Sequence, residues 1–179
     1  EPDLNWKNLD FIDTTWEAGS GNIGFGEVYD STVIAPATSL YIRLPFDSVV
    51  TANIKEMQLM IDYDDGFIAY LNGIEIARVN MGDTGTFKAF NALADRSHEA
   101  QFFKDYCYPL YGYHLDSNII KKCLRDGDNV LALQFHNDSI NGSDLFAFAY
   151  LQDITNASYS PYNWEWRSIQ QLKLDSSNL

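Results

Sequence analysis

The stretch MQLMIDYDDGFIAYLNGIEIARVN, residues 57–80, decides the fold class. Apolar side chains recur at every second position from Met57 to Tyr63, which is the period of a β-strand. Asp64-Asp65-Gly66 interrupts this pattern before an apolar, aromatic-rich run resumes. Asn72-Gly73 follows, and both residues tolerate the positive φ of a type I′ hairpin turn. The stretch therefore predicts three successive strands, at 57–63, 67–71 and 74–79.

Three further segments, 40–46, 130–136 and 145–151, have strand length and are bounded by Gly, Pro, Asn, Asp or Ser. The last two are apolar on both alternating sets of positions, as expected for strands that are covered on both faces. One short helix is predicted, with Ser117 as its N-cap and Gly127 beyond its end. Many short strands and few helices predict an all-β sandwich or barrel.

Composition limits the function classes. The chain has 179 residues, of which 46% are hydrophobic and 15% aromatic, so a single folded domain is expected. Twelve Lys and Arg residues stand against 25 Asp and Glu residues, which gives a net charge of −13. Without a basic run, neither nucleic acid nor an anionic membrane is an expected partner, and a neutral or cationic ligand fits better. No signal peptide or apolar run of transmembrane length occurs, and the start at Glu1 indicates a mature or excised fragment.

The motif GSGNIG, residues 19–24, has the G-x-G-x-x-G spacing of a dinucleotide-binding loop. Such a loop binds pyrophosphate only when a buried strand precedes it and a helix follows it. Residues 13–18 are not an apolar strand, and residues 25–30 lack helical periodicity. We therefore predict a glycine-rich surface loop and no nucleotide site.

The histidines and cysteines form no recognisable catalytic or metal motif. His98, His114 and His136 are widely spaced, and structural roles are expected for all three. Cys107 and Cys123 lack C-x-x-C spacing, so they either form a pair or sit apart as buried thiols.

The adjacent carboxylates Asp64 and Asp65 are predicted to be structural. In a turn, such side chains accept backbone N–H bonds more often than they form a catalytic pair. One of them is also a candidate ion-pair partner for Arg43 or Arg78. Since no G-x-S-x-G elbow occurs either, the sequence predicts a protein that is not an enzyme.

Several segments together resemble a known family. They are Trp16, the loop GSGNIGFG, Tyr41-Ile42-Arg43, YDDGFIAYLNGIEIARVN and NVLALQFHNDSINGSDLFAFAYL. In this order they resemble the galactose-binding-like jelly-roll domains of secreted bacterial multidomain proteins, which are found beside CotH kinase-like and lamin-tail domains. The resemblance implies a two-sheet antiparallel β-sandwich of jelly-roll type in a secreted or cell-surface protein that handles polysaccharide.

The resemblance also implies a domain organisation. Residues 1–160 are expected to form the jelly-roll domain, and residues 161–179 a tail that leads toward a following domain. The last residues, LDSSNL, resemble the junction into a CotH-type domain.

Structural calcium is the one cofactor that the resemblance implies, because jelly rolls of this type often hold an ion with loop carbonyls and carboxylates. The loop candidates are Glu27, Asp30, Asp138 and Asp144. No D-x-[DN]-x-[DN]-G register fixes their geometry, so solvated loop carboxylates are the alternative.

Two aromatic clusters bear on ligand binding: FFKDYCYPLYGYH at 102–114 and SYSPYNWEWRSI at 158–169. Exposed aromatic faces stack on the C–H patches of sugar rings, while nearby polar groups bond the hydroxyls. The candidate ligand-binding residues are Trp164, Trp166, Tyr162, Tyr108 and Tyr111. In the alternative, these aromatics pack loops onto the sandwich. Trp6 and Trp16 are expected in the core or at a sheet edge.

The sequence thus predicts a non-catalytic carbohydrate-binding accessory module, with a glycan and the adjacent domains of its parent protein as partners. The alternative is a structural module that positions a C-terminal CotH-like domain and binds no sugar.

Overall fold

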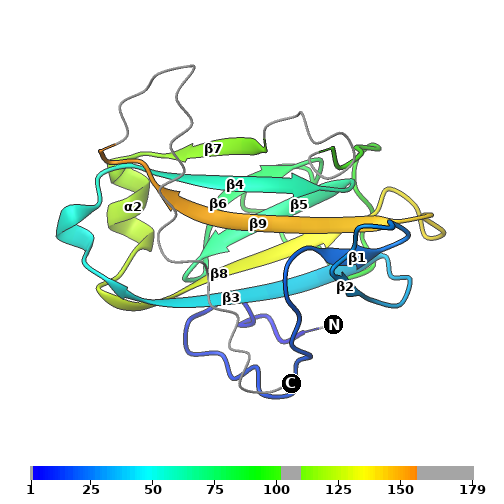
Figure 1. The fold of residues 1–179 in the computed structure, drawn as a ribbon, viewed down its shortest axis with the longest axis horizontal. Helices are drawn as coiled ribbons and strands as arrows, with labels where there is room; N and C mark the ends of the chain where they lie inside the picture. Colours follow the sequence, from blue (N-terminus) through cyan, green and yellow to red (C-terminus); the bar gives the residue numbers. More distant parts are fainter. Residues whose placement is uncertain (1, 102–109, 157–179) are drawn as a thin grey trace.

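The computed structural model describes residues 2–101 and 110–156, which form two β-sheets packed face to face (Figure 1). One sheet has the order β2-β1-β9-β4-β7, with β1 at Ile23–Phe25, β2 at Thr32–Val33, β4 at Met57–Tyr63, β7 at Tyr111–Leu115 and β9 at Leu145–Asp153. The other has the order β3-β8-β5-β6, with β3 at Ser39–Val49, β5 at Gly66–Leu71, β6 at Ile74–Val79 and β8 at Gly127–His136. All pairs are antiparallel except β1 with β2. Neither sheet closes into a barrel over the described residues, so the predicted β-sandwich is confirmed.

The hairpin between β5 and β6 has the predicted turn. Asn72 and Gly73 have φ values of 50° and 87°. The Asn72 side chain does more than tolerate this conformation: its Nδ2 donates to Cys123 O at 2.8 Å and to Asn129 Oδ1 at 2.7 Å. Its Oδ1 accepts the backbone N–H of Val130 at 2.8 Å. One buried amide thus links the hairpin to the end of the helix and to β8.

The short helix α2 spans Ser117–Cys123, but the prediction of Ser117 as its N-cap is wrong. Asp116 has the extended backbone of an N-cap, and its carboxylate accepts the N–H groups of Asn118 and Ile119 at 2.8 and 3.0 Å. A 3₁₀ turn, η1 at Thr51–Asn53, precedes β4.

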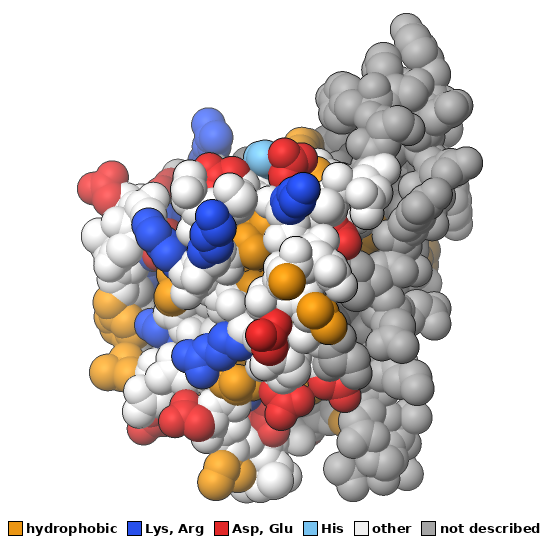
Figure 2. All heavy atoms as spheres, turned by 90° about the vertical axis from the view of Figure 1, so that its left-hand side faces the viewer, with side chains coloured by type: hydrophobic (Ala, Val, Ile, Leu, Met, Phe, Trp, Pro, Cys, Tyr) orange, Lys and Arg blue, Asp and Glu red, His pale blue; other side chains and the backbone are white. Residues whose placement is uncertain are grey.

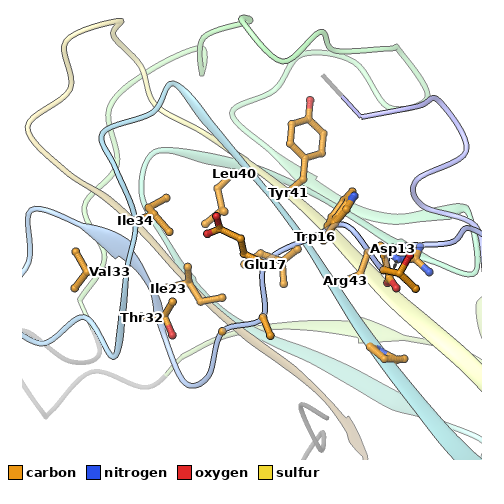
Figure 3. A pocket seen from close by; sticks show the side chains of 15 residues that line it. Asp13, Trp16, Glu17, Ile23, Thr32, Val33, Ile34, Leu40, Tyr41 and Arg43 are labelled. Atoms are coloured by element: carbon orange, nitrogen blue, oxygen red, sulfur yellow. Dashed lines mark hydrogen bonds and ion pairs between the residues drawn. The ribbon is translucent and has the colours of Figure 1, made fainter. Parts of the chain in front are cut away.

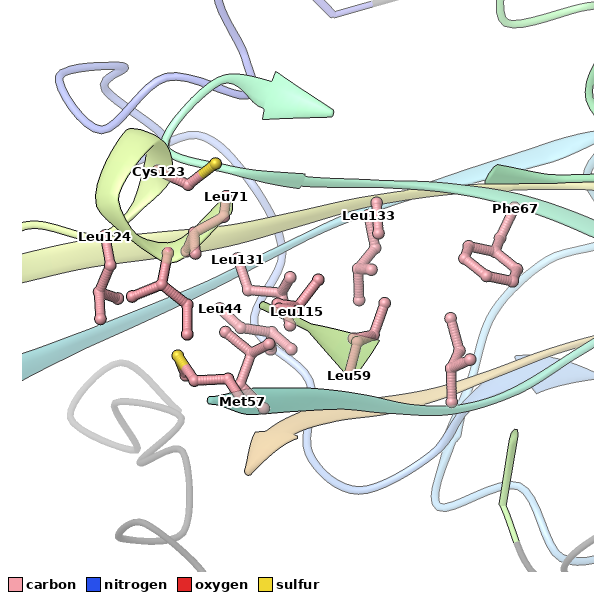
Figure 4. Packing of buried hydrophobic residues seen from close by; sticks show 14 of the residues in the cluster. Leu44, Met57, Leu59, Phe67, Leu71, Leu115, Cys123, Leu124, Leu131 and Leu133 are labelled. Carbon is pink, nitrogen blue, oxygen red and sulfur yellow. The ribbon is translucent and has the colours of Figure 1, made fainter. Parts of the chain in front are cut away.

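The main core lies between the two sheets (Figure 4). Its fully buried members include Leu59, Phe67, Leu133 and Phe135, each at most 1% exposed. Strand β8 is buried on both of its faces from residue 130 to 136, as its apolar pattern predicts. Cys123 is a free thiol in this core, where burial raises its pKa, and Cys107 lies outside the described residues.

A second layer covers the outer face of the β3-β8-β5-β6 sheet. Trp6, which is 6% exposed, packs there with Ile68, Tyr70 and Ala132. Trp6 is therefore a core residue, as predicted.

Arg43 fastens the N-terminal segment onto strand β3. Its side chain is 6% exposed, and its Nε donates to Asp13 Oδ2 at 2.8 Å. Its Nη1 donates to the carbonyls of Trp6 and, at 2.9 Å, of Asn8, and its Nη2 donates to the carbonyl of Phe11 at 3.3 Å. A buried guanidinium needs this many acceptors because each unpaired N–H costs desolvation free energy.

The predicted ion pairs of Arg43 or Arg78 with Asp64 or Asp65 are wrong. Arg43 pairs with Asp13, and Arg78 pairs with Glu75 through two bonds of 2.9 Å. Glu75 and Arg78 are three residues apart in β6, and Asp13 belongs to the N-terminal segment that Arg43 fastens onto β3. The two aspartates instead sit in the β4–β5 turn at one end of the sandwich (Figure 1).

The end of the sandwich that carries α2 has a mixed surface, with Lys and Arg side chains interspersed among Asp and Glu (Figure 2). Lys121 and Lys122 in the last turn of α2 contribute to it. Among the described residues, no helix is long and apolar enough to cross a bilayer.

Candidate functional site

A groove of about 850 Å³ opens between the edges of the two sheets (Figure 3). Strand β3 ends one sheet, and the β2–β1 pair ends the other. Side chains of β3, from Leu40 to Pro45, form one wall, while Ile23, Thr32 and Val33 form the opposite wall. The segment 13–19 completes the lining. Its volume is in the range of small-molecule sites.

The groove offers an aromatic face. Trp16 is partly buried and is stacked against Trp6, with ring centroids 6.3 Å apart, while Phe11 meets it edge-on at 5.8 Å. These contacts hold the indole in place, and Trp16 still lines the groove. Trp16 therefore packs against other aromatic side chains, as predicted, and it also lines the groove, which was not predicted.

The charged groups of the groove are Arg43, Asp13 and Glu17. Arg43 and Asp13 are bonded to each other. Glu17 is exposed, and among the described residues no hydrogen bond or ion pair engages it. Within the described part of the chain, the groove therefore has one carboxylate without a cationic partner.

A buried polar network stands behind the Tyr41 side of the groove. Gln134 Nε2 lies 2.9 Å from Tyr41 Oη, 3.1 Å from Lys88 O and 2.7 Å from His136 Nε2. His136 Nδ1 lies 2.7 Å from Ala92 O, so its proton is on Nδ1 and its Nε2 accepts from Gln134. Burial lowers the pKa of His136 to about 4 and keeps the imidazole neutral. The predicted structural role of His136 is supported by these contacts.

Carboxylates gather at the opposite end of the sandwich from α2, a region we call the acidic end, in the loops after β1, β4 and β8 and in residues 95–101. Glu27, Glu99 and Asp144 each place a carboxylate oxygen there, and these oxygens lie within 4.8 Å of one another. The approach depends on Gly26, which has φ of +92° and whose missing Cβ would lie 2.5 Å from Ser143 O. Oxygen donors at this spacing suit a hard cation such as Ca²⁺.

Two further aspartates belong to the acidic end. Asp64 is 4% exposed, and burial, reinforced by the charges of Asp65, Asp144 and Glu99, raises its pKa to about 9. Burial also raises the pKa of Asp30, with a contribution from Asp144, and the buried Asp30 Oδ1 has no hydrogen-bond partner among the described residues. A bound cation would stabilise the ionised form of both groups.

Asp65 has the structural role predicted for it. Its two carboxylate oxygens accept the backbone N–H groups of His98 at 2.7 Å and Asp138 at 2.8 Å. The carboxylate thereby joins the β4–β5 turn to residues 95–101 and to the β8–β9 loop.

The predicted ligand-binding aromatics fall mostly outside the described residues, as is the case for Trp164, Trp166, Tyr162 and Tyr108. Tyr111 begins β7 and is 40% exposed. It packs near Tyr63 and His98, at centroid distances of 5.9 and 5.5 Å, and does not line the groove.

The other two histidines make local contacts. His98 stacks on Tyr63 with ring centroids 4.1 Å apart. His114 Nε2 lies 3.7 Å from Glu56 Oε2, where both side chains are about half exposed. Neither belongs to the Glu27, Glu99 and Asp144 cluster.

Of the predicted calcium candidates, Glu27 and Asp144 come together, whereas Asp30 lies beside them and Asp138 is engaged through its backbone by Asp65. The sequence did not predict Glu99 in the acidic end, or Asp13, Glu17 and Tyr41 in the groove. Glu17 follows Trp16 directly, and this aromatic–acidic pair was the one available signal for the groove.

No family model matches the sequence, and no curated protein matches it either. Among solved structures, a β-glucuronidase from glycoside hydrolase family 2 aligns with 79% of this chain at 13% identity and a TM-score of 0.46. An α-L-rhamnosidase of Streptomyces avermitilis, in complex with L-rhamnose, aligns with 68% of it at 17% identity and a TM-score of 0.40. This chain spans only 13% and 10% of these two proteins, and likenesses this distant assign it no family or activity.

Proposed function

We propose that this chain is a non-catalytic carbohydrate-binding module and that the groove is its glycan site. The observation that carries the proposal is the geometry of the groove: a volume of about 850 Å³ between two sheet edges, with a fixed indole and polar side chains in its lining. Sugar rings need an apolar face together with a few directed hydrogen bonds.

The mechanism follows from the lining. Trp16 stacks on the C–H face of a sugar ring, while Thr14 and Glu17 bond its hydroxyls. The contacts between Trp16, Trp6 and Phe11 fix the indole in advance, which reduces the entropy lost on binding. Binding at one such site is weak and becomes useful when the module is tethered to another.

The non-catalytic assignment is supported by how the carboxylates are used. Asp65 is engaged by two backbone N–H groups, and Asp13 is engaged by Arg43. The resemblance noted above further leads us to propose a secreted or surface multidomain protein as the parent, with a CotH-like domain following this one.

We also propose that the acidic end holds a structural Ca²⁺ ion. Glu27, Glu99 and Asp144 would supply carboxylate oxygens, and Asp30 offers a buried oxygen to which no described residue donates. The ion would neutralise the like charges and fasten three loops together, so its role is in stability.

The glycan proposal is tested by pull-down on insoluble polysaccharides and by calorimetry with soluble oligosaccharides, using Trp16→Ala and Trp16→Phe. Tyr111→Ala is the matched control, because Tyr111 is a partly exposed aromatic away from the groove. Binding that is lost in folded Trp16→Ala, retained in part in Trp16→Phe and unchanged in Tyr111→Ala supports the groove.

The opposite pattern, with loss only in Tyr111→Ala, would move the glycan site to β7. Absence of binding to every polysaccharide would favour the structural module that positions its neighbouring domain.

A further inference from the structure

We propose that the groove selects glycans that carry a protonated amine, that is, unacetylated 2-amino-2-deoxy sugars, and that Glu17 determines this preference. The inference rests on the proposed glycan function of the groove. It follows from how the three charged side chains of the lining are occupied.

Arg43 is not available to an anionic sugar. Of its five N–H groups, four are donated: to Asp13 Oδ2, to the carbonyls of Trp6 and Asn8, and to that of Phe11. The guanidinium also lies over the Phe11 ring at 5.2 Å, and its side chain is only 6% exposed. A carboxylated or sulfated sugar would have to displace these contacts to gain one ion pair.

No other cation lines the groove within the described part of the chain. An anionic glycan would therefore meet Glu17 without compensation, in a protein whose net charge is −13. Repulsion between Glu17 and an anionic substituent therefore disfavours the binding of uronic acids and sulfated sugars.

Glu17 is placed to bind an ammonium group. It follows Trp16 in the chain, both line the groove (Figure 3), and its exposed carboxylate has no partner among the described residues. A sugar that stacks on the indole therefore shares the groove with an anionic acceptor. The amine of an unacetylated amino sugar supplies the charge that this acceptor lacks, and acetylation removes it.

The experiment compares three probes by calorimetry: oligomers of glucosamine, the same oligomers fully N-acetylated, and an oligoglucuronate. Wild type should bind the glucosamine oligomer about fivefold more tightly than the acetylated one, which is the scale of one exposed ion pair. The difference should shrink as salt is added and as the amine is deprotonated at higher pH. Oligoglucuronate should bind most weakly.

Glu17→Gln should bind the glucosamine oligomer and its fully N-acetylated form with equal affinity, because the amide carries no charge to attract the amine. Asp83→Asn, which removes an exposed carboxylate outside the groove, is the charge-matched control and should retain the preference. A preference that persists in Glu17→Gln, or disappears equally in both variants, overturns the assignment to Glu17.

The failure of this inference differs from the failure of the glycan function. If the acetylated and free-amine oligomers bind wild type equally, the selection is wrong and the glycan function stands. If neither oligomer binds, the glycan function itself falls. A lysine oligopeptide that binds with the same dependence on Glu17 would show a general cation site and overturn selection for amino sugars.

Discussion

In the lining of the groove, Arg43 and Asp13 meet as opposite charges 2.8 Å apart, whereas at the acidic end Glu27, Glu99 and Asp144 bring like charges within 4.8 Å. The first arrangement is complete within the chain itself. In the second, protons or a bound cation relieve the repulsion among the like charges. The difference teaches that, of these two charge arrangements, the acidic end is the one whose stability depends on protons or cations from the solution.

The largest effect on the free energy of unfolding is expected when the contacts of Arg43 are removed. Arg43→Met should lower the free energy of unfolding by about 3 kcal/mol, because three main-chain carbonyls and the partly exposed carboxylate of Asp13 lose their buried donor. Urea denaturation measures this loss, and limited proteolysis should show cleavage before residue 16. A loss below 0.5 kcal/mol, the scale of a surface substitution, would show that the N-terminal segment is held by its aromatic contacts alone.

The next largest effect concerns the binding of calcium at the acidic end. Calcium at a hundredfold excess over its Kd should raise the free energy of unfolding by about 2.7 kcal/mol, and chelator should remove that gain. Asp144→Asn should abolish the gain, whereas Asp13→Asn should leave it intact. A calcium effect of equal size in both variants would place the ion elsewhere.

The acidic end should also make the stability of the protein depend on pH when a chelator removes calcium. The pKa of Asp64 is about 9 in the folded chain and 3.8 in the unfolded chain, so the folded state binds more protons between these values. Stability should therefore fall as pH rises from about 4 through 9, and the slope between pH 6.5 and 9 should disappear in Asp64→Asn. A slope that persists in that variant would exclude Asp64 as its source.

The network behind the groove should respond to pH with the opposite sign. The pKa of His136 is about 4 in the folded chain and 6.5 in the unfolded chain, so the unfolded state binds more protons in this window. The contribution of His136 is present above pH 6.5 and is lost as pH falls toward 4. Thermal unfolding of His136→Gln and wild type at pH 7 and pH 4.5 measures it, and an equal loss on acidification in both proteins would contradict the prediction.

The strands could be predicted because their signals are local. Alternation in 57–63 and the Asn72-Gly73 turn fix a hairpin through neighbouring residues only, and β4 and β6 have the predicted bounds. The N-cap error is also local, since Asp116 and Ser117 are both favourable caps and only the geometry of the first turn distinguishes them.

The candidate site could be predicted only in part, because it depends on contacts between distant segments. The groove exists because β3 and the β2–β1 pair are both edge strands, a property of sheet order and not of any one segment. Glu99 reaches Glu27 and Asp144 through the anchoring of its loop by Asp65, and no residue near Glu99 in the sequence announces this.

The amide of Asn72 has a consequence for the chemical ageing of the protein. Asn-Gly pairs deamidate when the backbone nitrogen of the glycine attacks the asparagine side chain, which must rotate to meet it. At Asn72 both ends of the amide are bonded to other segments, so this rotation is blocked. Asn141, which is exposed and also precedes a glycine, has no such protection from burial. Of these two Asn-Gly pairs, we therefore expect deamidation first at Asn141 in the β8–β9 loop, beside the acidic end, and not at Asn72 in the hairpin that decides the fold.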